Sequence, residues 1–151
     1  MANRVLFLAA EAPGEPIRME ITSPGGLLAE SMDVVRIMGR VACPVDTLSQ
    51  GLVGGIATVI AASGTPGYRA ALPTCRFSLA FEGTALVGAL GTAQTDPVAQ
   101  QVVDTLLARA GQGRDQVLRW LAEGAEFTAE AARAAGLIDF IVPVPAPGSQ
   151  A

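Results

Sequence analysis

The pattern of hydrophobic and polar positions predicts strands and helices in alternation along this chain. Residues 17–22 alternate apolar with polar side chains, as a half-buried strand does. Residues 27–40 instead repeat their apolar side chains at the spacing of a helix with one buried face. The inward-facing residues predicted for these two segments are Ile17, Met19 and Ile21 in the strand, and Leu28, Met32, Val35 and Met38 in the helix.

Glycine, proline and capping residues divide the rest of the chain into further elements. Asp96 and Thr128 are predicted to cap two helices at their starts, and Gly111 and Gly136 to close them. The predicted helices are residues 1–10, a small-residue helix after Gly55 that stops at Gly64, and residues 97–110, 114–122 and 129–135. The predicted strands are residues 45–48, 68–71, 76–81 and 137–142. This alternation predicts a single α/β domain over residues 1–142, followed by a disordered proline-rich tail over residues 143–151.

A glycine-rich corner at residues 50–57 joins a short apolar strand to the small-residue helix. Many hydrolases use such a strand-to-helix elbow to present a nucleophilic side chain to a cleft. The residue at the top of this elbow is Gly55, which has no side chain to present. The corner is therefore either a packing device or the active corner of an enzyme whose nucleophile has been lost.

Composition limits the classes of function that this chain can have. It holds 151 residues, half of them apolar, which suffices for one domain with a substantial core. The net charge is -4 and no basic patch is present, so we expect no nucleic-acid partner. No apolar run near the start is long enough for a signal peptide or a membrane helix, and we expect no membrane partner. The two cysteines, Cys43 and Cys75, form no disulfide framework, which favours a cytoplasmic protein.

The sequence contains no histidine, and all ten of its basic residues are arginine. An arginine side chain stays protonated at any working pH and cannot act as a general base. Nucleophilic mechanisms that depend on a histidine or lysine base are therefore outside the chemistry of this chain alone. We also expect no metal and no cofactor.

Four segments in order resemble the proteolytic subunit of the Clp protease, a serine peptidase of the crotonase-like superfamily. They are residues 21–32, which contain Ser23-Pro24-Gly25-Gly26, the corner at residues 50–64, residues 67–76 and residues 127–139. The resemblance runs without a gap from residue 6 to about residue 81 and resumes from about residue 105 to residue 141. It implies a crotonase-type α/β core of short strands alternating with helices. The family pattern begins earlier than this chain does, so the resemblance implies an N-terminally truncated domain.

The resemblance also assigns the family's catalytic positions to residues of this chain. The nucleophilic serine position holds Gly55, the histidine position Ala80 and the aspartate position Trp120. The backbone amides of Gly26 and Ile56 would form the family's oxyanion hole. Loss of all three triad side chains predicts a catalytically inactive member of the family.

Two alternative functions stay open. An active Clp serine peptidase would need an unaligned nucleophile, for which Ser49 and Ser63 are the nearest candidates. An acyl-thioester-binding protein of the crotonase type would use the paired amides of Gly26 and Ile56 on the thioester oxygen. In the second case no Glu or Asp is clearly placed beside Gly26 and Gly55.

Further departures from the family pattern concern assembly. The family's docking pocket for its ATPase partner has aromatic residues where this chain has Arg18, Glu20 and Ala70, so we expect no stable docking. Residues 82–95 are several residues shorter than the family spacing before the helix through which rings stack. The interpretation is an inactive subunit with a structural or regulatory role in an oligomeric ring, self-associated or mixed with active Clp paralogues.

Overall fold

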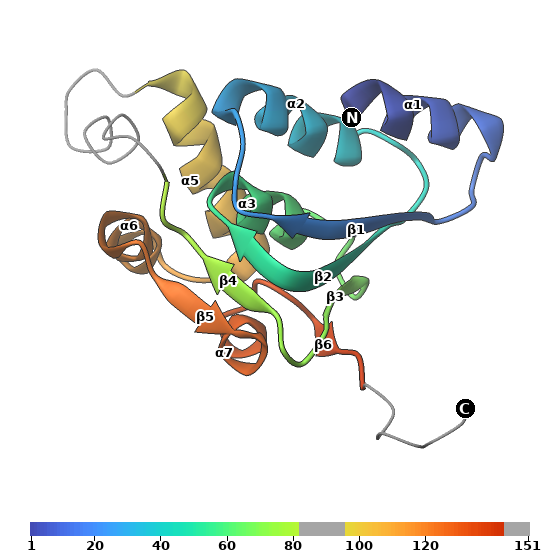
Figure 1. The fold of residues 1–151 in the computed structure, drawn as a ribbon. Helices are drawn as coiled ribbons and strands as arrows, with labels where there is room; N and C mark the ends of the chain where they lie inside the picture. The colour runs from blue at the N-terminus through green and yellow to red at the C-terminus, as the bar shows by residue number, and fades with distance from the viewer. Residues whose placement is uncertain (82–95, 144–151) are drawn as a thin grey trace.

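The computed structural model describes residues 1–81 and 96–143, and within them the predicted α/β alternation is confirmed (Figure 1). The described helices are α1 (Ala2–Glu11), α2 (Leu28–Met38), α3 (Ile56–Ala62), α5 (Pro97–Ala110), α6 (Arg114–Glu123) and α7 (Ala129–Ala134). The described strands are β1 (Ile17–Ser23), β2 (Val45–Gly54), β3 (Arg69–Ala71), β4 (Arg76–Ser78), β5 (Glu126–Thr128) and β6 (Phe140–Ile141). Of the predicted tail over residues 143–151, residues 144–151 lie outside the described residues, and so does the short segment 82–95.

Strand β2 is the centre of the sheet. Its first half pairs in parallel with β1 and β3, and its last three residues pair in parallel with β4. Strand β3 continues in parallel to β6, whereas β5 runs antiparallel to β4. Parallel pairing requires crossover connections, and the helices between the strands supply them. The corner that follows β2 therefore lies where three strands of the sheet meet.

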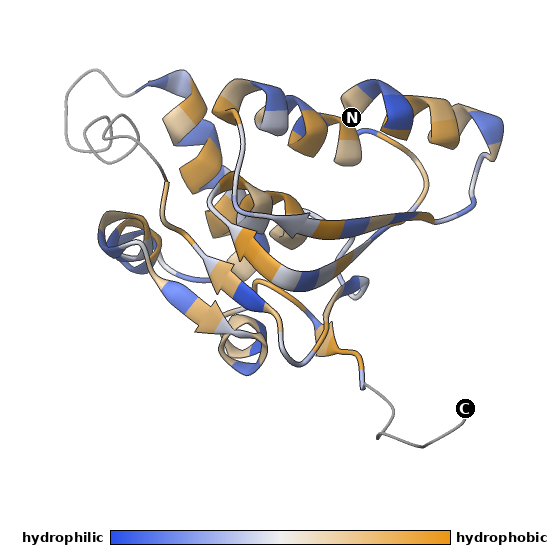
Figure 2. Ribbon diagram, viewed as in Figure 1, coloured by the Kyte–Doolittle hydropathy of each residue, from blue (hydrophilic) through white to orange (hydrophobic). Residues whose placement is uncertain are grey.

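The helices cover mainly one face of the sheet, as the burial of β1 shows. Its residues alternate between buried and exposed, and the buried ones are Ile17, Met19 and Ile21, as predicted. On the covered face, α3 packs against β2 and also contacts α2 and α5. Hydrophobic and hydrophilic residues follow one another in bands along α1 and α2 (Figure 2), as helices with one buried side require.

The buried face of α2 differs by one position from the prediction. Met32 and Met38 are buried as expected, but Val34 is buried in place of Val35. Leu28 and Val35 are only partly buried at the edge of the core. Helix α2 contacts α1 as well as α3 and α5, so several neighbours decide which of its residues are buried. The spacing of apolar residues in one helix cannot reveal those neighbours.

The strand predicted over residues 45–48 is too short, and one strand was missed. Strand β2 continues to Gly54, because its glycine-rich end pairs with β4. Strand β5 follows α6 at once and pairs with β4, a partner about 50 positions earlier in the chain. In the predicted strand 137–142 only Phe140 and Ile141 pair, whereas Leu137 and Ile138 are buried in the core before the strand begins.

The predicted helix boundaries of α5 and α7 are confirmed. The Asp96 carboxylate accepts a hydrogen bond from the amide of Val98 (3.0 Å), and Gly111 ends α5 in the left-handed conformation with φ 66°. The Thr128 hydroxyl accepts a bond from the Ala131 amide (3.1 Å). Gly136 follows α7 with φ 83°, and a Cβ atom there would collide with the Ala110 carbonyl. Gly136 therefore allows close contact between α5 and the end of α7.

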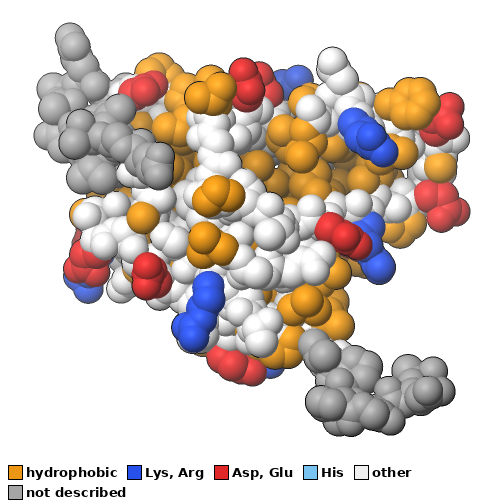
Figure 3. Space-filling model, viewed as in Figure 1, with side chains coloured by type: hydrophobic (Ala, Val, Ile, Leu, Met, Phe, Trp, Pro, Cys, Tyr) orange, Lys and Arg blue, Asp and Glu red, His pale blue; other side chains and the backbone are white. Residues whose placement is uncertain are grey.

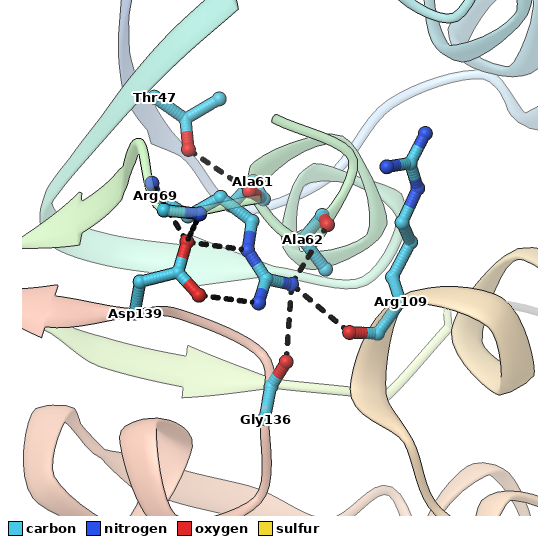
Figure 4. A network of polar contacts seen from close by, with 8 residues as sticks. Thr47, Ala61, Ala62, Arg69, Arg109, Gly136 and Asp139 are labelled. Atoms are coloured by element: carbon cyan, nitrogen blue, oxygen red, sulfur yellow. Dashed lines mark hydrogen bonds and ion pairs between the residues drawn. The ribbon is translucent and has the colours of Figure 1, made fainter. Parts of the chain in front are cut away.

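A partly buried ion pair joins distant parts of the chain (Figure 4). The Arg69 guanidinium donates to both carboxylate oxygens of Asp139, at 3.0 and 2.8 Å. The same guanidinium donates to three backbone carbonyls at 3.0 to 3.1 Å, those of Ala62, Arg109 and Gly136. The carboxylate also accepts the backbone amides of Gly67 (2.7 Å) and Arg69 (3.1 Å). This network connects β3 with the C-terminal ends of α3, α5 and α7.

Candidate active-site corner

Gly55 forms a sharp turn between the end of β2 and the start of α3. Its backbone angles are φ 54° and ψ -126°, a conformation that glycine adopts readily and other residues rarely do. Its amide donates to the Ser78 carbonyl (2.9 Å), and its carbonyl accepts the Thr58 amide (3.1 Å). The Thr58 hydroxyl lies 2.7 Å from the Ser78 carbonyl and 3.0 Å from the Val53 carbonyl. The corner therefore has the backbone of a strained strand-to-helix elbow, held against β4.

The Pro24-Gly25-Gly26 turn packs directly on this corner. A Cβ atom on Gly54 would lie 2.6 Å from the Pro24 carbonyl oxygen, so only glycine allows the contact. A Cβ atom on Gly26 would lie 4.0 Å from the Ile56 side chain. The structure thus brings the two residues assigned to the oxyanion hole side by side. That their amides act together on a bound oxygen stays a prediction.

The Gly26 and Ile56 amides are candidates for binding an external acceptor. Ile56 is the first residue of α3, and the amides of a first helical turn have no partner within the helix. Within residues 1–81 and 96–143, neither amide donates a hydrogen bond to a backbone carbonyl in a turn, loop or helix cap. Ser23 shapes the turn, since its hydroxyl donates to the Gly25 carbonyl (2.7 Å) and accepts the Gly25 amide (3.3 Å).

Ala80 lies beside the corner, where a histidine of a triad would be needed. Its carbonyl oxygen would be 3.1 Å from a Cβ atom on Gly55. Its own Cβ atom would be 3.2 Å from a Cβ atom on Gly124, the residue that ends α6. The amide of the preceding Leu79 donates to the Ala125 carbonyl (2.8 Å). The end of α6 is therefore in contact with the segment that carries Ala80.

Trp120 lies on α6 one turn before Gly124, and its side chain packs in the protein interior. It is buried, and its ring meets that of Phe127 edge to face, with centroids 5.2 Å apart and an angle of 87° between the planes. Such a pair stabilises the fold by more than its buried area alone. Trp120 is therefore a packing residue of the core. Of the three positions assigned to the triad, Gly55 and Ala80 are thus adjacent, and Trp120 lies on α6, the helix whose end at Gly124 contacts Ala80.

The two serines considered as replacement nucleophiles are buried. Ser49 lies within β2, between its pairings with Ile21 and Ala71, and its hydroxyl has no recorded hydrogen-bond partner in the described part of the chain. The Ser63 hydroxyl donates to the Val59 carbonyl (2.7 Å) at the end of α3. Neither geometry presents an oxygen to a substrate.

The described residues contain neither a reactive cysteine nor a group of side chains suited to a metal ion. Cys43 and Cys75 are free and buried, and burial raises the pKa of the Cys75 thiol to about 11, so its reactive thiolate is disfavoured. The described ranges contain no group of three His, Cys, Asp or Glu side chains that could hold a metal ion. None of the helices described here has the length and hydropathy of a membrane span.

The three positions assigned to the ATPase docking pocket lie near one another on the open face of the sheet. Arg18 and Glu20 are exposed residues of β1, and Glu20, Leu48 and Ala70 are in register across β1, β2 and β3. Arg18 and Ala70 also line a cavity of about 400 Å³ on this face. The apolar lining of this cavity comes from residues that the sequence reasoning missed: Leu48, Tyr68, Phe140 and Val142. They come from three separate segments, at β2, β3 and β6, and only the sheet order brings them together. The absence of ATPase docking stays a prediction.

Comparison with known proteins gives consistent results. The family model described as Clp protease matches residues 1–144. The chain is 31% identical over 147 residues to the ATP-dependent Clp protease proteolytic subunit 2 of Corynebacterium efficiens, covering 94% of this chain and 74% of that protein. It is 33% identical over 148 residues to the ATP-dependent Clp protease proteolytic subunit of Leuconostoc citreum, covering 92% of this chain and 73% of that protein.

Proposed function

This chain belongs to the Clp protease family, and we propose that it is a catalytically inactive subunit with a structural or regulatory role in an oligomeric ring. The observation that carries the proposal is the elbow itself. Its strained backbone is that of a nucleophile-bearing turn, yet Gly55 supplies no nucleophile. The adjacent Ala80 supplies no base.

Among the described residues, the alternative nucleophiles considered above are unsuited to replace these groups. With no histidine and no lysine in the sequence, the usual general bases for a serine or cysteine nucleophile are missing. Ser49 and Ser63 are buried, and Cys75 is held in its thiol form. A pair of backbone amides alone stabilises an oxyanion but forms no acyl-enzyme.

The proposed role follows from the folded core of the family, which this chain retains. The names of the matched relatives describe subunits of an ATP-dependent protease, that is, parts of an assembly. We infer that this chain contributes its folded core to such an assembly in the cytoplasm, with copies of itself or with active Clp peptidase subunits. Its influence on proteolysis would then come from occupying a position that holds no active site.

The experiment measures activity and assembly separately. Purified chain is incubated with short fluorogenic peptides and with a fluorophosphonate probe, next to an active Clp peptidase as a positive control. We expect neither turnover nor labelling. Turnover that disappears in Ser49→Ala or Ser63→Ala would instead assign an active peptidase with an unaligned serine.

Native mass measurement of the chain, alone and co-expressed with active Clp subunits, tests the assembly role. We expect small closed rings or lower oligomers for the chain alone, incorporation into mixed particles, and no stable capture of the ATPase. A chain that stays monomeric in both preparations would contradict the proposed role. A homogeneous fourteen-subunit particle that also captures the ATPase would contradict the predicted loss of axial contacts and of docking.

A further inference from the structure

The antiparallel pair of β4 and β5 reaches the Gly55 corner and brings the end of α6 to it. The recorded register joins Arg76 to Thr128, Phe77 to Phe127 and Ser78 to Glu126. The Leu79 amide continues this pairing, since it donates to the Ala125 carbonyl (2.8 Å). The next residue after β4, Ala80, therefore lies opposite Gly124, the residue that ends α6.

Ala80 is in close contact with both Gly124 and Gly55. A Cβ atom on Gly124 would lie 3.2 Å from the Ala80 Cβ atom and 3.4 Å from its Cα atom. On its other side, the Ala80 carbonyl oxygen would lie 3.1 Å from a Cβ atom on Gly55. Ala80 thus lies between the two glycines, as the histidine of a catalytic triad lies between the serine and the aspartate.

The side chain of Trp120 lies on the other face of this strand pair. Successive residues of a strand point to opposite faces, and here Phe77, Leu79 and Phe127 are buried whereas Ala80 is exposed. The Trp120 ring packs against the buried Phe127 ring, 5.2 Å away. A carboxylate at position 120 would therefore be separated from the Ala80 side chain by the backbone of the strand pair.

The backbone of Gly124 is compatible with a carboxylate side chain. Its angles are φ 60° and ψ 48°, a left-handed conformation in which aspartate and asparagine are enriched among non-glycine residues. The native carboxylate nearest in register is that of Glu126, opposite Ser78 and so diagonal to Ala80. Among the described residues, backbone and uncharged side chains form the surface over the end of β2 (Figure 3).

We propose that Gly124, rather than Trp120, occupies the place of the triad's carboxylate. Gly55, Ala80 and Gly124 then mark a Ser-His-Asp site from which all three side chains are missing. A carboxylate at position 124 would be a positioning residue: it would orient an imidazole at position 80 and stabilise its protonated form. This inference rests on the proposed function, in which the corner corresponds to that of a peptidase. The competing explanation is that Gly124 serves only to end α6.

A single introduced imidazole tests the proposal. The sequence contains no histidine, so NMR follows the titration of the ring in Ala80→His without overlap. Three chains are compared: Ala80→His alone, with Gly124→Asp and with Gly124→Asn, since asparagine matches aspartate in size and backbone preference but carries no charge. We expect the imidazole pKa to be about one pH unit higher with Gly124→Asp than with Gly124→Asn, because a facing carboxylate favours the protonated ring. Equal pKa values in these two chains would overturn the proposal and leave Gly124 as a helix end only.

Two further variants compare other positions for the carboxylate. Glu126 and Arg76 are the charged residues of β5 and β4 on the face of Ala80, and Glu126→Gln in the Ala80→His chain measures the native background. We expect this change, and that of Trp120→Asp, to move the imidazole pKa less than Gly124→Asp does. A larger effect at either position would overturn the assignment. If Trp120→Asp fails to fold by circular dichroism, the comparison of Gly124→Asp with Gly124→Asn decides.

A disulfide provides a measurement that needs no carboxylate at position 124. The two Cβ positions are close to the separation of about 3.5–4.5 Å found in disulfides, so the chain with Ala80→Cys and Gly124→Cys should cross-link on oxidation. If Gly124→Asp does not fold, failure of this cross-link would overturn the proposal. None of these measurements requires turnover. Labelling of the unmodified chain by fluorophosphonate would contradict the proposed function, whereas the imidazole pKa decides the assignment of Gly124.

Discussion

Replacing Arg69 by methionine should destabilise the fold more than any surface substitution of an arginine. Methionine keeps much of the side-chain volume and removes the guanidinium. The Arg69 side chain is 7% exposed and that of Asp139 is 24% exposed, so the pair is largely shielded from water. The substitution leaves the Asp139 carboxylate without its countercharge and three carbonyls without their shared donor.

The size of the effect can be worked out from these contacts. Breaking a fully buried pair by removing one partner costs about 3–5 kcal/mol, since the remaining charge stays buried and unpaired, and Asp139 at 24% exposed is less buried than in that case. Two backbone amides still donate to the Asp139 carboxylate, which places the expected loss near the lower end. We therefore expect the free energy of unfolding to fall by about 3 kcal/mol, a large part of the total for a domain of this size. The melting temperature should fall by about 6–12 °C.

Urea unfolding followed by circular dichroism measures this difference, with Arg133→Met as the matched control. The Arg133–Glu130 pair is also a short contact, at 2.7 Å, but its side chains are 51% and 68% exposed. Exposed pairs contribute less than about 1 kcal/mol, so the control should unfold close to the unmodified chain. All variants are compared at one protein concentration, because subunit association adds to apparent stability. Losses of similar size in the two variants would refute the argument from burial.

The pH dependence gives a second readout of the same pair. Hydrogen bonding to Arg69 is the main cause that holds the pKa of Asp139 below its ordinary value of 3.8. A carboxyl group with a lowered pKa in the folded state stabilises the fold above its unfolded pKa and loses this contribution as the pH falls through the folded pKa. The stability difference between the unmodified chain and Asp139→Asn should therefore be constant near neutral pH and shrink below about pH 4. A difference that grows on acidification would contradict this sign.

Three further substitutions test separate features of the structure. Gly136→Ala should lower the unfolding free energy by about 1–3 kcal/mol, because φ is 83° and the new Cβ atom collides with the Ala110 carbonyl; urea unfolding measures it. Ser49→Ala should leave stability unchanged or raise it by up to about 1 kcal/mol, since it removes a buried hydroxyl with no recorded partner, and a clear loss would reveal a hidden one. Gly55→Ser should not restore fluorophosphonate labelling at neutral pH, because Ala80 provides no base.

Much of the fold could be predicted because its signals are local. Asp96, Thr128 and the glycines after α5 and α7 mark helix ends through contacts within a few residues. Elements that depend on distant partners could not be predicted in the same way. Strand β5 has three residues and exists because β4 lies beside it. The burial of Val34 in α2 likewise depends on the helices that pack against it.

In the candidate site, too, the features with local sequence signals could be predicted, and those that depend on distant residues could not. A corner at Gly55 follows from the glycines and the apolar strand before it, and the resemblance assigned Ala80 as its neighbour. The Arg69–Asp139 network was missed, because its two charges lie 70 positions apart and each resembles an ordinary surface residue in the sequence. The contact of Gly124 with Ala80 was also missed, since it depends on the register of β5 against β4.

At the corner, the contacts that hold the backbone are present, whereas Gly55 and Ala80 carry no side chain able to act as a nucleophile or a base. Two sets of contacts shape the turn, and neither involves a substrate. Pro24 packs closely against Gly54, and the Thr58 hydroxyl contacts the carbonyls of Val53 and Ser78. Gly55 adopts the strained φ at little cost, whereas a serine there would add about 1–3 kcal/mol of backbone strain. A chain that performs no acyl transfer has no need to bear that strain. Glycine at this position therefore fits a subunit in which the corner serves the packing of β2, β4 and α3.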